Sequence, residues 1–218
     1  MFTTPLNKRI YTFASRVFRR RRFSLFQEWI ETLPRPLLIL DVGGSRDFWE
    51  AMGTNPAEGP EITLLNRDAD RAGSAAGLVV GDAQALPYPD RSFDIVFSNS
   101  VIEHMGSRAG QVRMAQEIRR VGRRFFVQTP NRYFPVEPHF LIPLFQFLPA
   151  GWQWRLLLRL KVEYFSVRIS TPEQAREAAR EIVLLSKKEF RALFPEGRLA
   201  VEKFLWIAKS FTIYGEME

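Results

Sequence analysis

A short apolar run that stops at a pair of glycines places the tightest constraint on how this chain can fold. Residues 37–42 (LLILDV) are apolar except for Asp41, and Gly43 and Gly44 follow them directly. Such a run is typical of a strand that is buried on both faces of a parallel sheet. Glycines at its end allow a ligand to approach the backbone closely. The sequence therefore predicts an α/β fold with a ligand site at the carboxyl edge of its sheet.

Further strands and helices alternate along the chain. We expect strands at 61–66, 78–80, 93–98 and 124–128, a helix at 108–121, and one or two closing strands between 198 and 214. Two capping boxes, Thr171 with Gln174 and Ser186 with Glu189, begin further helices. This order predicts a Rossmann-like, doubly wound, mostly parallel sheet with helices on both faces.

The excess positive charge lies in the first 22 residues. They hold 7 of the 31 Lys and Arg residues and no acidic residue, and the other 24 basic residues match the 24 acidic ones. Apolar residues at helical spacing on both sides of the arginine run at 19–22 predict two amphipathic helices within residues 5–30. Pro34 and Pro36 end the pattern. We therefore separate a basic helical arm, residues 1–36, from a domain at 37–218.

Two interpretations of the arm stay open. Residues 5–30 contact an anionic membrane surface, or their apolar stripes pack on the sheet and leave the arginines in water. The apolar stripes favour a membrane over a nucleic-acid partner. Nothing in the sequence indicates the oligomeric state.

Composition excludes several classes of protein. The chain has no cysteine, which rules out disulfides, thiolate catalysis and cysteine-bound metals. The uncharged stretch 140–154 is interrupted by two prolines and is too short for a membrane span. No apolar segment of a secretory signal follows the early charges, and a native helix explains the arm better than a mitochondrial presequence. We expect a cytoplasmic protein, membrane-peripheral if the arm binds lipid.

Asp41 restricts the ligand at the glycine turn. A dinucleotide fold places a pyrophosphate at the helix after the glycines, where a nearby carboxylate would repel it. The dinucleotide fingerprint G-x-G-x-x-G is also absent. A carboxylate at this position favours a cationic ligand, and S-adenosylmethionine carries an ammonium and a sulfonium group.

Four segments together resemble the class I S-adenosylmethionine-dependent methyltransferases, especially the broad bacterial group called type 11. They are the glycine turn after residues 39–42, GDAQALP at 81–87, SFDIVFSN at 92–99 and VIEH at 101–104. Their order and spacing agree with the family over roughly residues 37–130. The stretch from 128 to 139 is similar to one subgroup of these enzymes.

The resemblance implies a set of residues that hold S-adenosylmethionine. In the family, an Asp after the third strand binds the adenine amino group, and an acidic residue after the second strand binds the ribose hydroxyls. Two positions depart from the pattern: Ser45 and Asp47 stand where later glycines are usual, and Asn66 replaces the ribose-binding acid. The expected cofactor residues are Asp41, Gly43, Gly44, Asn66, Asp82, Ala83 and Asn99.

Residues 129–170 interrupt the alternation and are rich in Phe, Leu and Trp. We interpret them as an insertion after the fifth strand that forms a lid over the acceptor site. Within it, Glu137 and His139 are the candidate catalytic residues, with His139 as general base; the alternative is a histidine that anchors the loop. We expect no metal, because the chain has only two histidines and lacks helical zinc spacing.

The resulting functional hypothesis is a methyltransferase that acts on a small-molecule or lipid-like acceptor, at oxygen or nitrogen. The altered glycine turn supports a competing hypothesis, a catalytically inactive module that binds S-adenosylmethionine or a partner.

Overall fold

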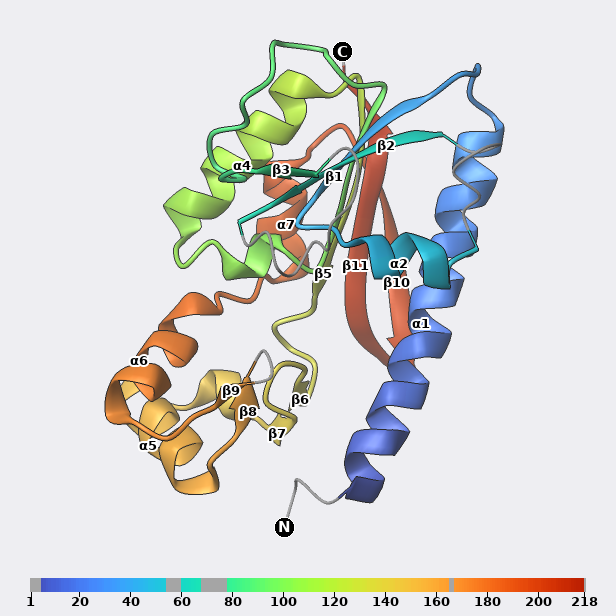
Figure 1. Cartoon of the computed structure of the whole chain (residues 1–218). Coiled ribbons are helices and arrows are strands. Elements are labelled where there is room, and N and C mark those ends of the chain that lie inside the picture. Colours follow the sequence, from blue (N-terminus) through green and yellow to red (C-terminus); the bar gives the residue numbers. More distant parts are fainter. Residues whose placement is uncertain (1–4, 54–59, 68–77, 165–166, 218) are drawn as a thin grey trace.

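A seven-stranded sheet with helices on both faces forms the body of the protein in a computed structural model (Figure 1). The structure describes residues 5–53, 60–67, 78–164 and 167–217, and the side chains from residue 18 onward. The sheet has the order β10-β11-β5-β4-β1-β2-β3. Its strands are β1 (Leu38–Val42), β2 (Glu61–Asn66), β3 (Leu78–Val80), β4 (Ile95–Asn99), β5 (Arg124–Pro130), β10 (Arg198–Phe204) and β11 (Ile207–Glu216).

The strand order reverses between β1 and β4. From β1 the chain proceeds through β2 to β3 on one side, and from β4 to β5 on the other, with all these pairs parallel. Within this sheet β11 alone runs opposite to the other six strands, since it pairs antiparallel with both β5 and β10. In sheets of this kind the crevice for a ligand opens at the carboxyl ends of the two strands beside the reversal. The doubly wound, mostly parallel sheet predicted from the sequence is confirmed.

Two apolar cores cover the two faces of the sheet. Helices α4 (Arg108–Val121) and α7 (Lys187–Leu193) pack on one face, where Met114, Ile118 and Phe190 are fully buried. Helices α1 (Pro5–Glu31) and α2 (Arg46–Ala51) cover the other face. Both predicted capping boxes are present, at Thr171 and Ser186.

The arm is one continuous helix, so the prediction of two helices within residues 5–30 is wrong. The arginine run lies inside α1, which extends from Pro5 to Glu31. Arginine is a good helix former, and neither glycine nor proline interrupts the run, so nothing in it breaks the helix. The second apolar stripe packs on the sheet: Phe23, Phe26 and Ile30 are buried. The side chains of the first stripe lie outside the described residues.

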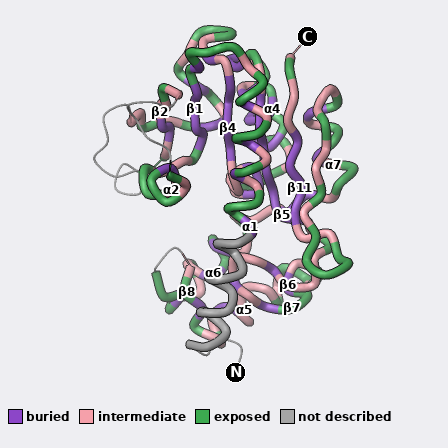
Figure 2. The backbone as a smooth tube through the Cα atoms, turned by 90° about the vertical axis from the view of Figure 1, so that its right-hand side faces the viewer, coloured by how far each residue is buried: buried purple, intermediate pink, exposed green. Residues whose placement is uncertain are grey.

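A smaller unit separates β5 from α7 (Figure 2). It contains two short hairpins, helix α5 (Ala150–Leu160) and helix α6 (Pro172–Glu181). The hairpins are β6 (Val136–Glu137) with β7 (Ile142–Pro143), and β8 (Glu163–Tyr164) with β9 (Val167–Arg168), and a 3-10 turn, η2 (Phe145–Phe147), precedes α5. Residues such as Phe140 and Leu157 build an apolar core of its own. Its two ends meet where Asn131 and Leu185 form an isolated bridge.

We expect Phe26→Ala to destabilise the protein by about 3–5 kcal/mol, the range for removing a buried aromatic ring. Phe26 is fully buried and contacts the rings of Trp29, Trp49, Phe97 and Phe126. Urea unfolding monitored by circular dichroism measures the loss. The partly exposed Val112→Ala on α4 is the control and should change stability by under about 0.5 kcal/mol. Equal stability of the two variants would show that α1 is not part of the cooperative core.

Candidate functional site

A cavity of about 350 Å³ opens at the carboxyl edge of the sheet, beside the point where the strand order reverses. Gly43, Asn66 and Ala83, three of the predicted cofactor residues, line it. They follow or end β1, β2 and β3, so parallel pairing brings them to one edge. The remaining wall includes Ser45, Leu65, Arg67, Gly81, Ser100, Val101, His104, Met105 and Glu181.

Both positions of the turn require glycine, because other side chains lie too close for a Cβ atom. Gly43 has a positive φ of 82°, and a Cβ atom there would lie 2.4 Å from a methyl group of Val101. A Cβ atom at Gly44 would lie 1.9 Å from Oδ2 of Asp41. The turn therefore folds back onto the β1 carboxylate, and any side chain at Gly44 would displace it.

Asp41 is buried behind the turn, although we expected it at the exposed ligand edge. The residue is 1% exposed, and its Oδ2 accepts a 2.7 Å hydrogen bond from Nε1 of Trp49 in α2. Burial raises the pKa of Asp41 to about 7, and the hydrogen bond from Trp49 opposes this shift. A carboxyl group in this state ionises readily when a cationic ligand approaches.

Three other predicted cofactor residues have partners within the chain. Asn66 lines the cavity and donates from Nδ2 to the carbonyl of Gly44 at 3.0 Å. Asp82 is exposed, and its Oδ1 accepts from the amide of Gln84, an arrangement typical of a turn. Asn99 ends β4 and accepts a hydrogen bond from Arg22 of α1. Neither Asp82 nor Asn99 is among the residues that line this cavity.

The wall after β4 contains residues in and directly after the VIEH segment, which the resemblance places at the methionine end of the cofactor, although none of them is among the expected cofactor residues. Val101, His104 and Met105 line the cavity, on and around the 3-10 turn η1 (Ile102–His104). The VIEH segment was noticed as part of the resemblance, but the motif alone does not say which of its side chains face the cavity.

Glu137 holds His139 in one orientation. Its carboxylate is 1% exposed and accepts from Nδ1 of His139 at 2.6 Å, and from the amides of His139 and Phe140 at 2.8 and 2.7 Å. Burial lowers the pKa of His139, but the hydrogen bond and charge of Glu137, together with the charge of Glu103, outweigh burial and raise it. The second ring nitrogen, Nε2, points toward Glu103.

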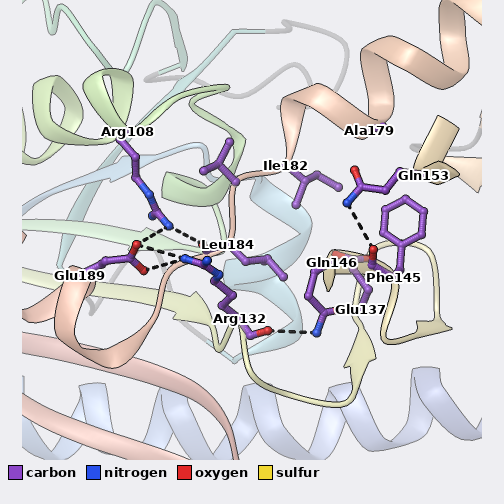
Figure 3. A pocket seen from close by; sticks show the side chains of 11 residues that line it. Arg108, Arg132, Glu137, Phe145, Gln146, Gln153, Ala179, Ile182, Leu184 and Glu189 are labelled. Carbon is purple, nitrogen blue, oxygen red and sulfur yellow. Dashed lines mark hydrogen bonds and ion pairs between the residues drawn. The ribbon is translucent and has the colours of Figure 1, made fainter. Parts of the chain in front are cut away.

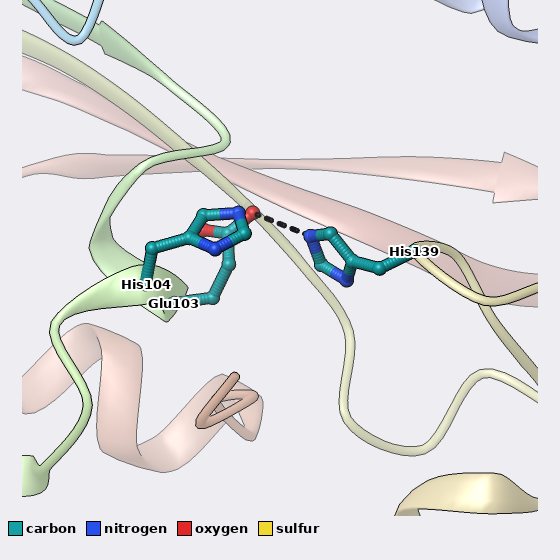
Figure 4. A group of neighbouring side chains, drawn as sticks. All are labelled: Glu103, His104 and His139. Carbon is teal, nitrogen blue, oxygen red and sulfur yellow. Dashed lines mark ion pairs between the residues drawn. The ribbon is translucent and has the colours of Figure 1, made fainter. Parts of the chain in front are cut away.

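Glu103, His104 and His139 come together in space (Figure 4). One potential ligand atom from each lies within 4.8 Å of the others, so the three residues could hold a metal ion. Nε2 of His139 lies 3.9 Å from Oε1 of the buried Glu103, and the two imidazole rings are 4.7 Å apart. We considered the pairs Glu103-His104 and Glu137-x-His139 as a metal site and expected none, because neither pair has helical zinc spacing. The two pairs come together because the insertion folds back over η1.

A second cavity, of about 370 Å³, lies between the insertion and the sheet domain (Figure 3). Its wall combines apolar side chains, such as Phe145 and Ile182, with Arg108 and Arg132, which both pair with Glu189. Glu137 lines this cavity, whereas His104 lines the first one. His139 contacts both residues, so the path Glu137–His139–His104 connects the two cavities.

The reversed strand order and the cavity at the carboxyl edge of the sheet are typical of a Rossmann-like, doubly wound fold. Residues 47–124 match the model of a family described as a methyltransferase domain. Part of the chain is therefore similar to a methyltransferase domain, and its fold is the Rossmann-like one that solved S-adenosylmethionine-dependent methyltransferases also have.

Named methyltransferases are among the known proteins with a similar sequence or fold. The chain is 37% identical over 121 residues to a protein of Encephalitozoon cuniculi that is provisionally named a methyltransferase, covering 52% of this chain and 55% of that protein. The chain thus spans about half the length of the curated relatives it matches. A solved S-adenosylmethionine-dependent methyltransferase from Methanosarcina mazei has a similar fold, with a TM-score of 0.54 at 14% identity over 86% of this chain and 95% of that one.

The plantazolicin methyltransferase BpumL, solved in complex with S-adenosylhomocysteine, shares the fold along the whole chain. The TM-score is 0.55 and the identity 12%, with 100% of this chain and 92% of that chain covered. At this level of identity the similarity shows the fold alone.

We expect Asp41→Asn to stabilise the ligand-free protein at alkaline pH. The folded-state pKa of Asp41, about 7, exceeds the ordinary value of 3.8. Between these two pH values the folded protein binds more protons than the unfolded chain, so the protein loses stability as the pH rises through them. Asn cannot ionise and still accepts from Trp49. Thermal melts should show a higher Tm than wild type at about pH 8 and little difference at about pH 4. The same melting difference at both pH values would contradict a buried, neutral carboxyl group.

Proposed function

We propose that the protein transfers a methyl group from S-adenosylmethionine to a small or lipid-like acceptor, at oxygen or nitrogen. The observation that carries the proposal is the cavity at the reversal of strand order, lined on one side by the glycine turn and on another by His104, whose ring contacts that of His139. The cysteine-free sequence supports a cytoplasmic location for this activity. Among the described residues, no helix is both long and apolar enough to cross a membrane.

The residues around the first cavity fit S-adenosylmethionine. The turn at Gly43 and Gly44 presents backbone without side chains, and the nearby Asp41 can supply a negative charge. Asn66 ends β2, where the family places its ribose-binding residue. We therefore propose Asp41, Gly43, Gly44, Asn66 and Ala83 as cofactor residues. Asp82 and Asn99 belong to the same proposal, as residues that shape the loops after β3 and β4.

Positioning supplies much of the rate in such a reaction. The cofactor supplies a methyl group on a sulfonium, a good leaving group in an in-line displacement. The chain must hold the acceptor in line with that bond and exclude water. The first cavity is lined on one side by Val101 and Met105, which contribute apolar surface.

His139 is the proposed general base for a hydroxyl acceptor. Glu137 accepts a hydrogen bond from the Nδ1–H group of His139. The unprotonated Nε2 can then take the proton of the acceptor hydroxyl as the new bond to the methyl carbon forms. Glu103 lies 3.9 Å from Nε2, and its charge stabilises the imidazolium that results. Glu137 is therefore the positioning partner of His139.

The second cavity is the proposed acceptor site. Five of its lining residues lie within residues 129–170, and one of them, Glu137, is bonded to His139. Apolar side chains such as Phe145 and Ile182 suit an apolar portion of the acceptor, and Arg108 and Arg132 suit an acidic group on it. This combination supports a small or lipid-like molecule over an extended protein segment.

A binding module without catalysis is the second candidate. Ser45 and Asp47 occupy positions where the family usually has glycine. In the structure Ser45 stands at the N-cap position of α2 without a capping hydrogen bond from its side chain, and Asp47 lies in the first turn of the helix. Calorimetry with S-adenosylmethionine and a mass-resolved screen of extracts for methylated products separate the candidates. Binding without any product supports the module, and the absence of binding excludes both.

We expect His139→Ala to lower turnover about a hundredfold and to leave the affinity for S-adenosylmethionine unchanged, because the histidine acts on the acceptor. Turnover is measured as formation of S-adenosylhomocysteine with the acceptor found in the screen. Added imidazole should restore part of the rate, which would not happen if His139 only anchored its loop.

Removal of metal ions is a second test of the cluster formed by Glu103, His104 and His139. If His139 is a base, dialysis of the wild-type protein against a chelator should leave turnover unchanged. A loss that divalent cations reverse would instead assign Glu103, His104 and His139 to a metal site and contradict the base.

The pH dependence of kcat/KM gives a further prediction. The base acts when neutral, and Glu137 raises the pKa of His139, so the rate should rise with pH above about 6.5, the ordinary histidine value. Glu137→Gln removes the charge that raises this pKa and should move the rising limb to lower pH. If kcat/KM rises at the same pH in wild type and variant, the pH dependence does not come from His139. A thermal melt of the variant checks that it remains folded.

A further inference from the structure

The turn between β10 and β11 exposes four consecutive apolar residues. Phe204 is 45% exposed, Leu205 76%, Trp206 93% and Ile207 47%. Phe204 pairs with Ile207 at the end of the hairpin, so Leu205 and Trp206 form its two-residue tip. Exposed tryptophan and leucine at one point of a surface indicate a contact with something apolar.

Folding alone does not explain these residues. Leu205 has a positive φ of 53°, a conformation that favours glycine or asparagine. Two-residue hairpin turns accordingly prefer Asn-Gly and similar pairs. This turn carries backbone strain and exposes two large apolar side chains, and neither feature benefits the isolated fold. An external apolar contact accounts for both.

Positive charge surrounds this hairpin tip. The ring of Phe204 packs edge-on against Phe18 of α1, with centroids 6.1 Å apart. The next three residues of α1, Arg19–Arg21, are exposed, and so is Lys203 beside the tip. The three arginines belong to the segment, residues 1–22, that holds all the excess charge of the chain. An apolar point beside exposed arginines complements an anionic bilayer, which offers hydrocarbon beneath acidic head groups.

The hairpin reaches past the carboxyl edge of the sheet. Ser210 of β11 pairs with Pro130, the last residue of β5, and the strand extends three residues further to Ile207. Phe204 also contacts Phe134 in the loop after β5, with ring centroids 6.3 Å apart. In the same loop Tyr133 stacks on Phe147, and both are at least half exposed. The apolar surface therefore lies at the edge of the sheet that carries the proposed site.

We propose that the hairpin tip, Phe204–Ile207, and the exposed arginines of α1, Arg19–Arg21, together form a docking surface for an anionic lipid bilayer. The tip enters the interfacial region, where tryptophan is preferred, and the arginines bind the head groups. Docking in this orientation holds the carboxyl edge of the sheet toward the membrane. The consequence that the acceptor is delivered from the bilayer rests on the proposed function; docking itself does not.

Co-sedimentation of the full chain with vesicles tests the proposal. We expect binding to phosphatidylcholine vesicles that contain phosphatidylglycerol, release at high salt, and little binding to phosphatidylcholine alone. The double variant Leu205→Ser with Trp206→Ser should bind about tenfold more weakly or worse, because the apolar contact is lost. Replacing Arg19, Arg20 and Arg21 with Gln should weaken binding by a similar factor and remove most of its salt dependence.

Matched control variants show whether binding depends on this surface in particular or only on the number of apolar and charged residues. Val112→Ser removes an exposed apolar residue on α4, and Lys187, Lys188 and Arg191→Gln remove three exposed charges on α7, on the opposite face of the sheet from α1. Both controls should bind like wild type. Lipids brominated near the head group should quench part of the tryptophan fluorescence, and Trp206→Ser should lose that quenching.

Three outcomes would overturn the proposal. They are wild-type protein that does not bind anionic vesicles, binding that the tip variant retains in full, and a dimer in size-exclusion chromatography that the tip variant abolishes while vesicle binding is absent. The last result would assign the tip to a second copy of the chain. S-adenosylmethionine binding, measured by calorimetry on the same variants, should be unchanged and reports separately on the proposed function.

Discussion

The carboxylate of Asp41 folds back beneath the glycine turn and accepts a hydrogen bond from Trp49. This is possible only because Gly44 has no side chain. The bond ties β1 to α2, and the ring of Trp49 in turn contacts Phe23 and Phe26 of α1. These contacts therefore couple three features: the position of the glycine turn, the start of α2 and the packing of α1 on the sheet. A change at this point reaches the cofactor cavity and the apolar core together.

The layout of the sheet was predictable because strong local signals mark its boundaries. The strands at 61–66 and 78–80 and the helix at 108–121 have the predicted bounds, and both capping boxes begin helices. The strand expected from residue 93 begins at Ile95, because Phe93 forms only an isolated bridge with Gly122. Local patterns are weaker where a segment has no breaker. The arginine run of α1 was interpreted as a junction, although nothing in it ends a helix.

The sequence predicted which segments lie at the candidate site better than it predicted how individual side chains are placed there. The glycine turn was predicted from the strand that ends there, and Asn66 from the resemblance to a family; both lie at the cavity because strand ends in a parallel sheet converge on one edge. The exposure of Asp82 and the burial of Asp41 were not, since both depend on the neighbours that a loop acquires on folding. Contacts between distant segments have no local signature at all. Arg22 bonds Asn99 across 77 positions, and His139 meets Glu103 only after the insertion folds over η1.

The insertion enters and leaves the sheet domain at adjacent points. Asn131 and Leu185 form a bridge, the amide of Arg132 donates to the carbonyl of Leu185, and the segment between them has its own apolar core. A unit joined in this way can be exchanged without a change in the length or direction of the flanking chain. Evolution or an engineer can replace this unit, the proposed acceptor-binding part, and keep the glycine turn, Asp41 and α1 as they are. The two neighbouring attachment points make residues 132–184 a natural cassette for changing specificity.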